Sequence, residues 1–192
     1  SSKNFFKITC PTKDLLSYLK KENVFEINKM FYLQDAIINI QDYIKKIKEN
    51  DKVFLDKIKK YNHYFLAVGR LTKQKNYPYL INEFINYLKI KKDGILLIIG
   101  DGEEKDALIE LIKKHNVSKN IFILNNINNV YPFMKKARAL ILPSLWEEVG
   151  FVIVEAAFCN LFVISSDCPN GPIEFLENGE AGYLFQSNKK NE

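Results

Sequence analysis

Two cations lie close together in a loop that follows an apolar segment. Residues 63–69 are mostly apolar and end at glycine, Arg70 comes next, and Lys75 stands where a helix is expected to begin. Because ligands of open α/β sheets bind at the carboxyl ends of the strands, both side chains can converge over one crevice. Arginine offers phosphate oxygens a planar fork and lysine a compact point charge, so the pair suits a diphosphate. The alternative is two surface cations that cap a strand and a helix.

Two carboxylates, Glu147 and Glu155, lie eight residues apart in a second loop and the helix expected after it. Gly150 stands between them, and the helix is expected to begin near Phe151. The free backbone N–H groups of a helix start can bind an anion or sugar oxygens. Glu147 could accept hydrogen bonds from sugar hydroxyls, and Glu155, one turn into the helix, from a ribose. The spacing alone is weak evidence, and the position after a strand gives it weight.

Two further loops contain glycine turns. Gly100-Asp-Gly102 follows an apolar run, but a dinucleotide fingerprint would need a third glycine where Lys105 stands, so a nicotinamide cofactor loses support. Asp101 and Glu103 leave open a metal-dependent transferase, and a plain turn into a helix is the simpler interpretation. The segment 165–172 is rich in turn residues and ends in Gly-Pro, which favours a new helix start.

Short apolar runs alternate with amphipathic ones from residue 61 onward. The expected strands are 63–69, 94–100, 121–124, 139–142, 162–165 and 182–185. The expected helices are 76–91, 103–116, 130–137, 151–160 and 171–176. Strands that are apolar on both faces and alternate with helices indicate a parallel sheet covered on both sides. The sequence therefore predicts an α/β domain with a doubly wound, Rossmann-like parallel sheet and helices on both faces.

The first 60 residues have a different pattern. Strands are expected at 4–9 and 30–33, and helices at 12–21 and 41–60. These are too few strands to close a domain. We therefore expect residues 1–60 to be the remnant of a preceding domain plus a linker, and residues 61–192 to be the main domain. A cap that decorates the main domain is the alternative.

The composition is that of a soluble globular protein, with 47% apolar and 27% charged residues. A net charge of +5 suits an anionic ligand or an anionic membrane surface, but it is too small for a nucleic-acid partner. Three cysteines without metal-site spacing favour a reducing compartment. The longest apolar stretch, 151–164, is interrupted and too short to span a bilayer. We expect a cytoplasmic protein without a metal site.

The order of these loops resembles the C-terminal domain of the retaining glycosyltransferases of family 4, which have the GT-B fold. The resemblance covers about residues 61–186. Its motifs here are Gly69-Arg70, Lys75, Gly100-Asp101-Gly102, Ser144, Glu147 with Glu155, and the stretch 167–174. The Cys-Pro-Asn-Gly-Pro variant at 168–172 is most similar to bacterial enzymes that build surface or protein-linked glycans.

The resemblance implies that Arg70 and Lys75 hold the diphosphate of a sugar nucleotide and stabilise the leaving group, and that Glu147 contacts the donor sugar. The residues it implies for donor binding are Gly69, Gly102, Asn125, Asn126, Gly150, Phe151, Val152 and Glu155. It implies no cofactor and no metal, and family frequency favours a UDP-sugar. The implied reaction transfers a hexose or N-acetylhexosamine with retention to a glycan or lipid-linked acceptor, with peripheral contact at the inner membrane surface.

Some positions depart from the family pattern. Glu148 and Val149 stand where the family often has Gly and Phe, and Asn125 stands where many members have glycine beside the base. The acceptor-binding domain and the closing C-terminal helix are expected to be essentially missing. The fragment is therefore expected to bind the donor without efficient turnover. The alternative is a non-catalytic nucleotide-binding or interaction module of the same fold.

Overall fold

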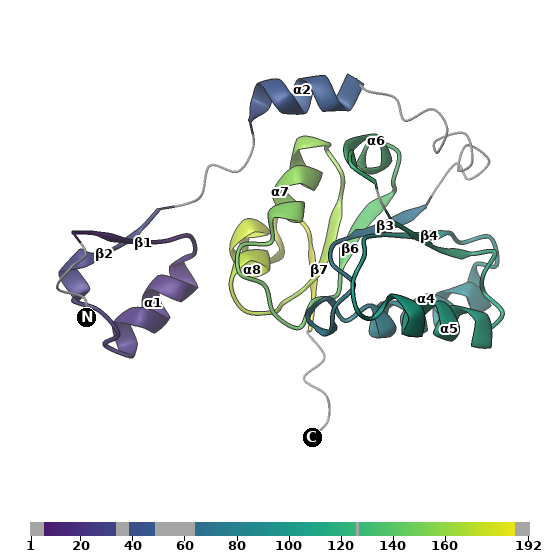
Figure 1. Cartoon of the computed structure of the whole chain (residues 1–192), viewed down its shortest axis with the longest axis horizontal. Coiled ribbons are helices and arrows are strands. Elements are labelled where there is room, and N and C mark those ends of the chain that lie inside the picture. Colours follow the sequence, from purple (N-terminus) through teal and green to yellow (C-terminus); the bar gives the residue numbers. More distant parts are fainter. Residues whose placement is uncertain (1–5, 34–38, 49–63, 126, 187–192) are drawn as a thin grey trace.

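A six-stranded parallel sheet forms the centre of the protein in a computed structural model that describes residues 6–33, 39–48, 64–125 and 127–186 (Figure 1). Its strands lie in the order β5-β4-β3-β6-β7-β8, and every neighbouring pair is parallel. The strands are β3 (Phe65–Val68), β4 (Leu96–Ile99), β5 (Ile121–Leu124), β6 (Ala139–Leu142), β7 (Val163–Ser166) and β8 (Tyr183–Phe185). The predicted parallel sheet is confirmed.

Helices cover both faces of this sheet, as predicted for a doubly wound fold (Figure 1). Alternate residues of β4 show the division, because Leu96 and Ile98 join the cluster under α4 and α5 whereas Leu97 joins the opposite cluster with residues of α6 and α7. The helices are α4 (Tyr77–Ile90), α5 (Lys105–Lys114), α6 (Tyr131–Met134), α7 (Phe151–Phe158) and α8 (Gly171–Phe175), with 3-10 turns η3 (Lys73–Lys75) and η4 (Glu177–Gly179).

The strand order reverses between β3 and β6. From β3 the chain moves outward through β4 to β5, then returns to β6 on the other side of β3 and continues outward through β7 to β8. Connections from neighbouring strands diverge at such a point and leave a crevice at the carboxyl ends of the strands. The loops that follow β3 and β6 therefore flank one opening.

The helix before β6 is shorter than the sequence predicts. A helix was expected over 130–137, but α6 covers only Tyr131–Met134. The chain must enter β6 at Ala139, and the Arg138 N–H already donates to the Tyr64 carbonyl at 2.8 Å at the start of the sheet. Sheet pairing therefore ends the helical segment early.

A small β-α-β unit precedes the sheet domain. It comprises β1 (Ile8–Cys10), α1 (Lys13–Lys21), the turn η2 (Ile27–Lys29) and β2 (Met30–Tyr32), and its two strands are parallel. The Glu174 carboxylate of α8 accepts hydrogen bonds from the Lys13 N–H at 3.0 Å and from the Tyr32 hydroxyl at 2.7 Å. One acidic side chain thus links this unit to the sheet domain. Part of the predicted strand 4–9 lies outside the described residues.

Helix α2 (Ile40–Lys48) packs on the sheet domain through an aromatic cluster. The Tyr43 ring meets those of Tyr131 and Phe158 edge to face, with centroids 5.1 and 5.2 Å apart, and its hydroxyl donates to the Phe158 carbonyl. The Asn129 side chain donates to the Lys46 carbonyl at 2.6 Å. The first part of the predicted helix 41–60 is confirmed, and 49–60 lie outside the described residues.

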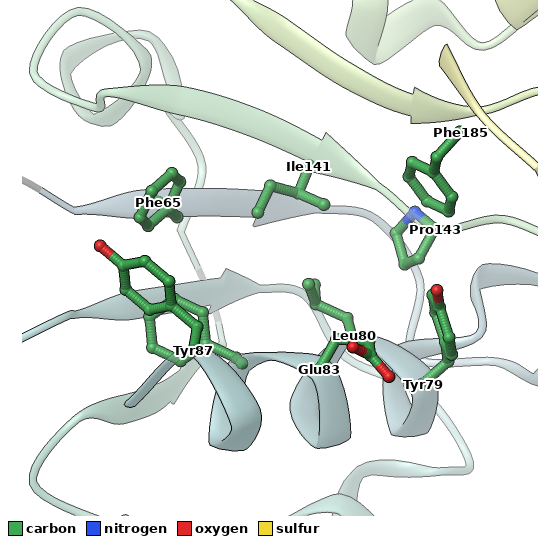
Figure 2. A pocket seen from close by; sticks show the side chains of 9 residues that line it. Phe65, Tyr79, Leu80, Glu83, Tyr87, Ile141, Pro143 and Phe185 are labelled. Atoms are coloured by element: carbon green, nitrogen blue, oxygen red, sulfur yellow. The ribbon is translucent and has the colours of Figure 1, made fainter. Parts of the chain in front are cut away.

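An apolar groove of about 320 Å³ runs along α4 where that helix borders the strands β3, β6 and β8 (Figure 2). Phe65, Ile141 and Phe185 come from the strands, whereas Tyr79 and Tyr87 come from α4. Glu83 is the one charged side chain in its lining. The groove therefore offers no cation to an anionic ligand.

We expect Tyr43→Ala to lower the free energy of unfolding by about 1–3 kcal/mol, because it removes two ring contacts and a hydrogen bond. Chemical denaturation measures this loss. Ile44→Ala on the same helix, where the side chain is exposed, should change stability by less than about 0.5 kcal/mol. Equal stability of Tyr43→Ala and the unmodified chain would contradict the docking of α2.

Candidate functional site

A cleft of about 330 Å³ opens at the carboxyl ends of β3 and β6, at the point where the strand order reverses. Its walls are the loop after β3, the loop after β6 and the first turns of α7. The residues that line it are Val68, Gly69, Arg70, Gln74, Lys75, Glu147, Glu148, Val149, Gly150, Phe151, Val152 and Glu155.

Most of the site residues expected from the sequence meet in this cleft. Those that line it are Gly69, Arg70, Lys75, Glu147, Gly150, Phe151, Val152 and Glu155. Gly102 and Asn125 are not in its lining, and Asn126 lies outside the described residues. The sequence predicted that both cations converge with the start of α7. In the structure, both cations and the first residues of α7 line the same cleft.

A buried ion pair joins the two walls of the cleft. The Lys75 ammonium donates to Glu147 Oε1 at 2.5 Å, and the two side chains are only 13% and 5% exposed. The Ser144 hydroxyl donates to the same oxygen, also at 2.5 Å. Charges removed from water are tolerated where they are paired and hydrogen-bonded, and each of these two needs the other. The pair therefore fixes the loop after β3 against the loop after β6.

Gln74 reinforces this connection with two hydrogen bonds. Its carbonyl accepts from the Leu145 N–H at 2.8 Å, and its side-chain amide donates to the Trp146 carbonyl at 2.9 Å. Gln74 was not among the predicted site residues, because a single glutamine in a polar loop has no distinguishing pattern.

The Gly100-Asp-Gly102 turn packs closely against the loop after β3. A Cβ atom on Gly100 would lie 1.9 Å from the Gly69 carbonyl oxygen, and one on Gly102 would lie 2.5 Å from the Leu71 carbonyl oxygen. The Asp101 carbonyl accepts from the Leu71 N–H at 2.8 Å. These glycines permit close approach of two backbones, which favours the simple turn over a ligand-binding motif.

The loop after β7 supports the other wall in the same way. A Cβ atom on Gly171 would lie 1.9 Å from the Val149 carbonyl oxygen. The Asn170 side chain donates to the Glu147 carbonyl at 2.9 Å, and the Ser166 hydroxyl to the Ser144 carbonyl at 2.6 Å. The turn-rich segment 165–172 therefore holds the position of Glu147.

Gly150 gives the chain its entry into α7. It caps the helix with a φ of 73° and a ψ of 46°, a left-handed conformation that glycine adopts without steric cost. The helix that follows is eight residues long, and its first residues, Phe151 and Val152, line the cleft. The first N–H groups of an α-helix have no partner within the helix, so they are available at this edge.

Glu155 lines the cleft in a partly desolvated position. Burial is the main cause that raises the pKa of its carboxyl group, and the positive charge of Lys46 on α2 opposes that shift. Helix α2 thus contributes a charge near the cleft. Residues 1–60 were expected to be a remnant or a decorating cap, and neither expectation included a charge near the cleft.

Within the described residues, no three His, Cys, Asp or Glu side chains gather as a metal ion would require. The Asp101 carboxylate instead accepts from the Gly102 N–H at 3.1 Å and pairs with Lys105 at 3.3 Å. No helix in the same part of the chain is long and apolar enough to span a membrane.

The fold and the cleft together define the class. A doubly wound parallel sheet with a charged cleft at its switch point is a Rossmann-like domain, and it matches one half of GT-B glycosyltransferases. Residues 45–192 match the family described as glycosyl transferases group 1. The chain belongs to that family.

Two curated relatives illustrate the relationship. An uncharacterized glycosyltransferase of Methanocaldococcus jannaschii is 35% identical over 154 residues, which are 80% of this chain and 35% of the relative. The N-acetylgalactosamine-N,N'-diacetylbacillosaminyl-diphospho-undecaprenol 4-alpha-N-acetylgalactosaminyltransferase of Campylobacter jejuni is 28% identical over 190 residues, which are 99% of this chain and 51% of the relative. The chain thus spans about half of these relatives or less.

The fold is also similar to that of solved structures. Anabaena HepE, solved in complex with UDP, superposes with a TM-score of 0.80 at 17% identity, over 97% of this chain and 51% of that protein. At this identity the likeness concerns the fold.

Glu155→Gln should stabilise the protein at neutral pH, because it removes a buried charge. A carboxyl group with a raised pKa in the folded state takes up a proton before the unfolded chain does, so its cost to stability falls as the pH falls. The advantage of Glu155→Gln should therefore shrink below neutral pH and vanish once the pH drops below the ordinary glutamate pKa of about 4.3. Thermal unfolding across this range measures it, and a variant less stable at pH 7 would contradict the assignment.

Proposed function

We propose that the cleft between β3 and β6 binds the nucleotide diphosphate of a sugar nucleotide. We further propose that the whole protein transfers a hexose or N-acetylhexosamine from it, with retention, to a glycan or lipid-linked acceptor. One observation carries the proposal, namely that Arg70, Lys75 and the start of α7 face a single cleft at the sheet's switch point. Fold alone would not carry it, because one fold hosts many functions.

The cations and the helix start suit a diphosphate. The Arg70 guanidinium can bind two phosphate oxygens at once, and the Lys75 ammonium adds a point charge. The N–H groups at the start of α7 add donors and the positive end of the helix dipole. As the bond from the anomeric carbon to the phosphate oxygen breaks, negative charge grows on the leaving diphosphate. Groups fixed in advance around that charge lower the barrier.

Glu147 and Glu155 would then bind the donor sugar and the ribose, which lie on either side of the diphosphate. Glu147 now pairs with Lys75. A bound diphosphate would offer Lys75 a second anionic partner and leave Glu147 oxygens free to accept from donor-sugar hydroxyls. Glu155, deeper along α7, would accept from the ribose. Uracil is the proposed base, since HepE was solved in complex with UDP. Gly102, Asn125 and Asn126 stay predictions as donor-binding residues.

The name of one relative supports a lipid-linked acceptor as part of this proposal. The name of the Campylobacter jejuni relative includes a diphospho-undecaprenol acceptor. We propose that residues 1–60 are the end of an acceptor-binding domain and its linker, and that the protein acts in the cytoplasm with peripheral contact at the inner membrane surface. Transfer needs the acceptor held in line with the donor, so the isolated chain should bind without efficient turnover.

The chain should bind UDP in the presence of EDTA, and Arg70→Ala should weaken binding by about 10- to 100-fold, the range expected for a hydrogen bond to a charged group. Calorimetry gives the affinity, and fluorescence of Trp146, which adjoins Glu147 and is 48% exposed, gives a second signal. Arg138→Ala is the matched control. Arg138 directly precedes β6, so it lies at the amino-terminal end of that strand, whereas the cleft lies at the carboxyl end.

Unchanged affinity in Arg70→Ala would remove the diphosphate assignment, and an equal loss in Arg138→Ala would point to a general charge effect. In the full-length protein, Glu147→Ala should abolish transfer. A full-length protein that binds UDP but transfers no sugar would favour a non-catalytic binding module instead.

A further inference from the structure

Tyr77, the first residue of α4, has a buried hydroxyl without a partner. The residue is 0% exposed, and its hydroxyl makes no hydrogen bond within the described residues. Tyr64, which is also fully buried, donates to the Phe133 carbonyl at 2.7 Å. Buried tyrosine hydroxyls normally find a partner, and a phenylalanine would fill the same space without an unsatisfied group. Packing alone therefore does not account for a tyrosine at this position.

The hydroxyl of Tyr77 lies beside Gly69, a residue that lines the cleft. A Cβ atom on Gly69 would lie 3.0 Å from this hydroxyl oxygen and 3.2 Å from Lys75 Cε. Gly69 and Lys75 both line the cleft, whereas the Tyr77 ring belongs to the apolar cluster under α4. The ring is thus anchored in the core, and its hydroxyl borders the same point beside Gly69 as Lys75 Cε does.

The surroundings keep this hydroxyl protonated. Burial, and then the negative charge of Glu147, raise the pKa of Tyr77 far above its usual value. A neutral tyrosine hydroxyl can donate one hydrogen bond and still accept another through its lone pairs. It can therefore accept a hydrogen bond from the N–H of an ammonium group.

The Lys75 ammonium has three N–H donors, and its hydrogen-bond partner among the described residues is Glu147. A diphosphate in the cleft would draw the ammonium away from Glu147. The Tyr77 hydroxyl, which lies near Lys75 Cε on the same side of Gly69, is an unused acceptor for the ammonium in that second position.

We infer that Tyr77 is a positioning residue for Lys75, whose ammonium donates to the Tyr77 hydroxyl when a nucleotide diphosphate occupies the cleft. The inference rests on the proposed function of the cleft. It adds a specific state of the site, in which the Lys75 ammonium donates to a phosphate oxygen and to the Tyr77 hydroxyl.

The test compares UDP with UMP in calorimetric titrations of the 192-residue chain and of Tyr77→Phe. Tyr77→Phe should lower the affinity for UDP relative to UMP by about 3- to 10-fold, the effect of one neutral hydrogen bond. UMP lacks the second phosphate that Lys75 would bind, so its affinity should hardly change. The melting temperature of Tyr77→Phe should be unchanged or higher, because the variant loses no hydrogen bond of the ligand-free protein.

Two controls separate this role from a structural one. Tyr64→Phe removes a satisfied buried hydrogen bond, so it should lower the melting temperature and leave the ratio of UDP to UMP affinity unchanged. In a Lys75→Met background, Tyr77→Phe should have no further effect on UDP binding. A chain that binds UDP with the same ratio in Tyr77→Phe would overturn the inference, as would an equal loss of both ligands. Failure of the unmodified chain to bind UDP would instead overturn the proposed function, and the inference with it.

Discussion

The buried ion pair between Lys75 and Glu147 is the interaction on which the site depends. Each charge has given up most of its water, so each depends on its partner to offset the cost of burial. The pair spans the point where β3 and β6 send their chains in opposite directions. It therefore links the two walls of the crevice. It also holds an ammonium group where little water screens it, so that its electrostatic attraction for an anionic ligand is strong.

Close backbone contacts hold the two charged groups in register. The end of β4 approaches the loop after β3 at Gly100, and the loop after β7 approaches the loop after β6 at Gly171. A side chain at either position would collide with a carbonyl oxygen and push its wall of the cleft outward. The rigidity of the site thus originates in strands that contribute no side chain to the cleft. Such support is what a preorganised electrostatic site requires.

The sequence predicts the fold well because its signals are local. Apolar runs that alternate with amphipathic ones give the strands and helices, and polar residues after the strands of the switch point gather by topology. Arg70, Lys75, Glu147 and Glu155 could be located in this way. The sequence does not reveal Gln74, whose partners lie in a loop about 70 residues away.

Other features depend on tertiary contacts that no local pattern encodes. The charged stretch after residue 40 has helical spacing, which predicts a helix. That spacing does not predict that Tyr43 packs on α6 and α7. Gly102 looked like part of a ligand-binding turn, yet its missing side chain leaves room for the Leu71 backbone. Asn125 follows β5, which β4 separates from β3, and it does not line the cleft.

A crystal structure of the chain with UDP would show where the diphosphate binds. We expect phosphate oxygens within hydrogen-bond distance, about 3 Å, of both the Lys75 ammonium and the Arg70 guanidinium, with the ribose toward Glu155. UDP bound elsewhere, such as in the groove beside α4, would contradict it. So would UDP in the cleft with its phosphates turned away from both cations.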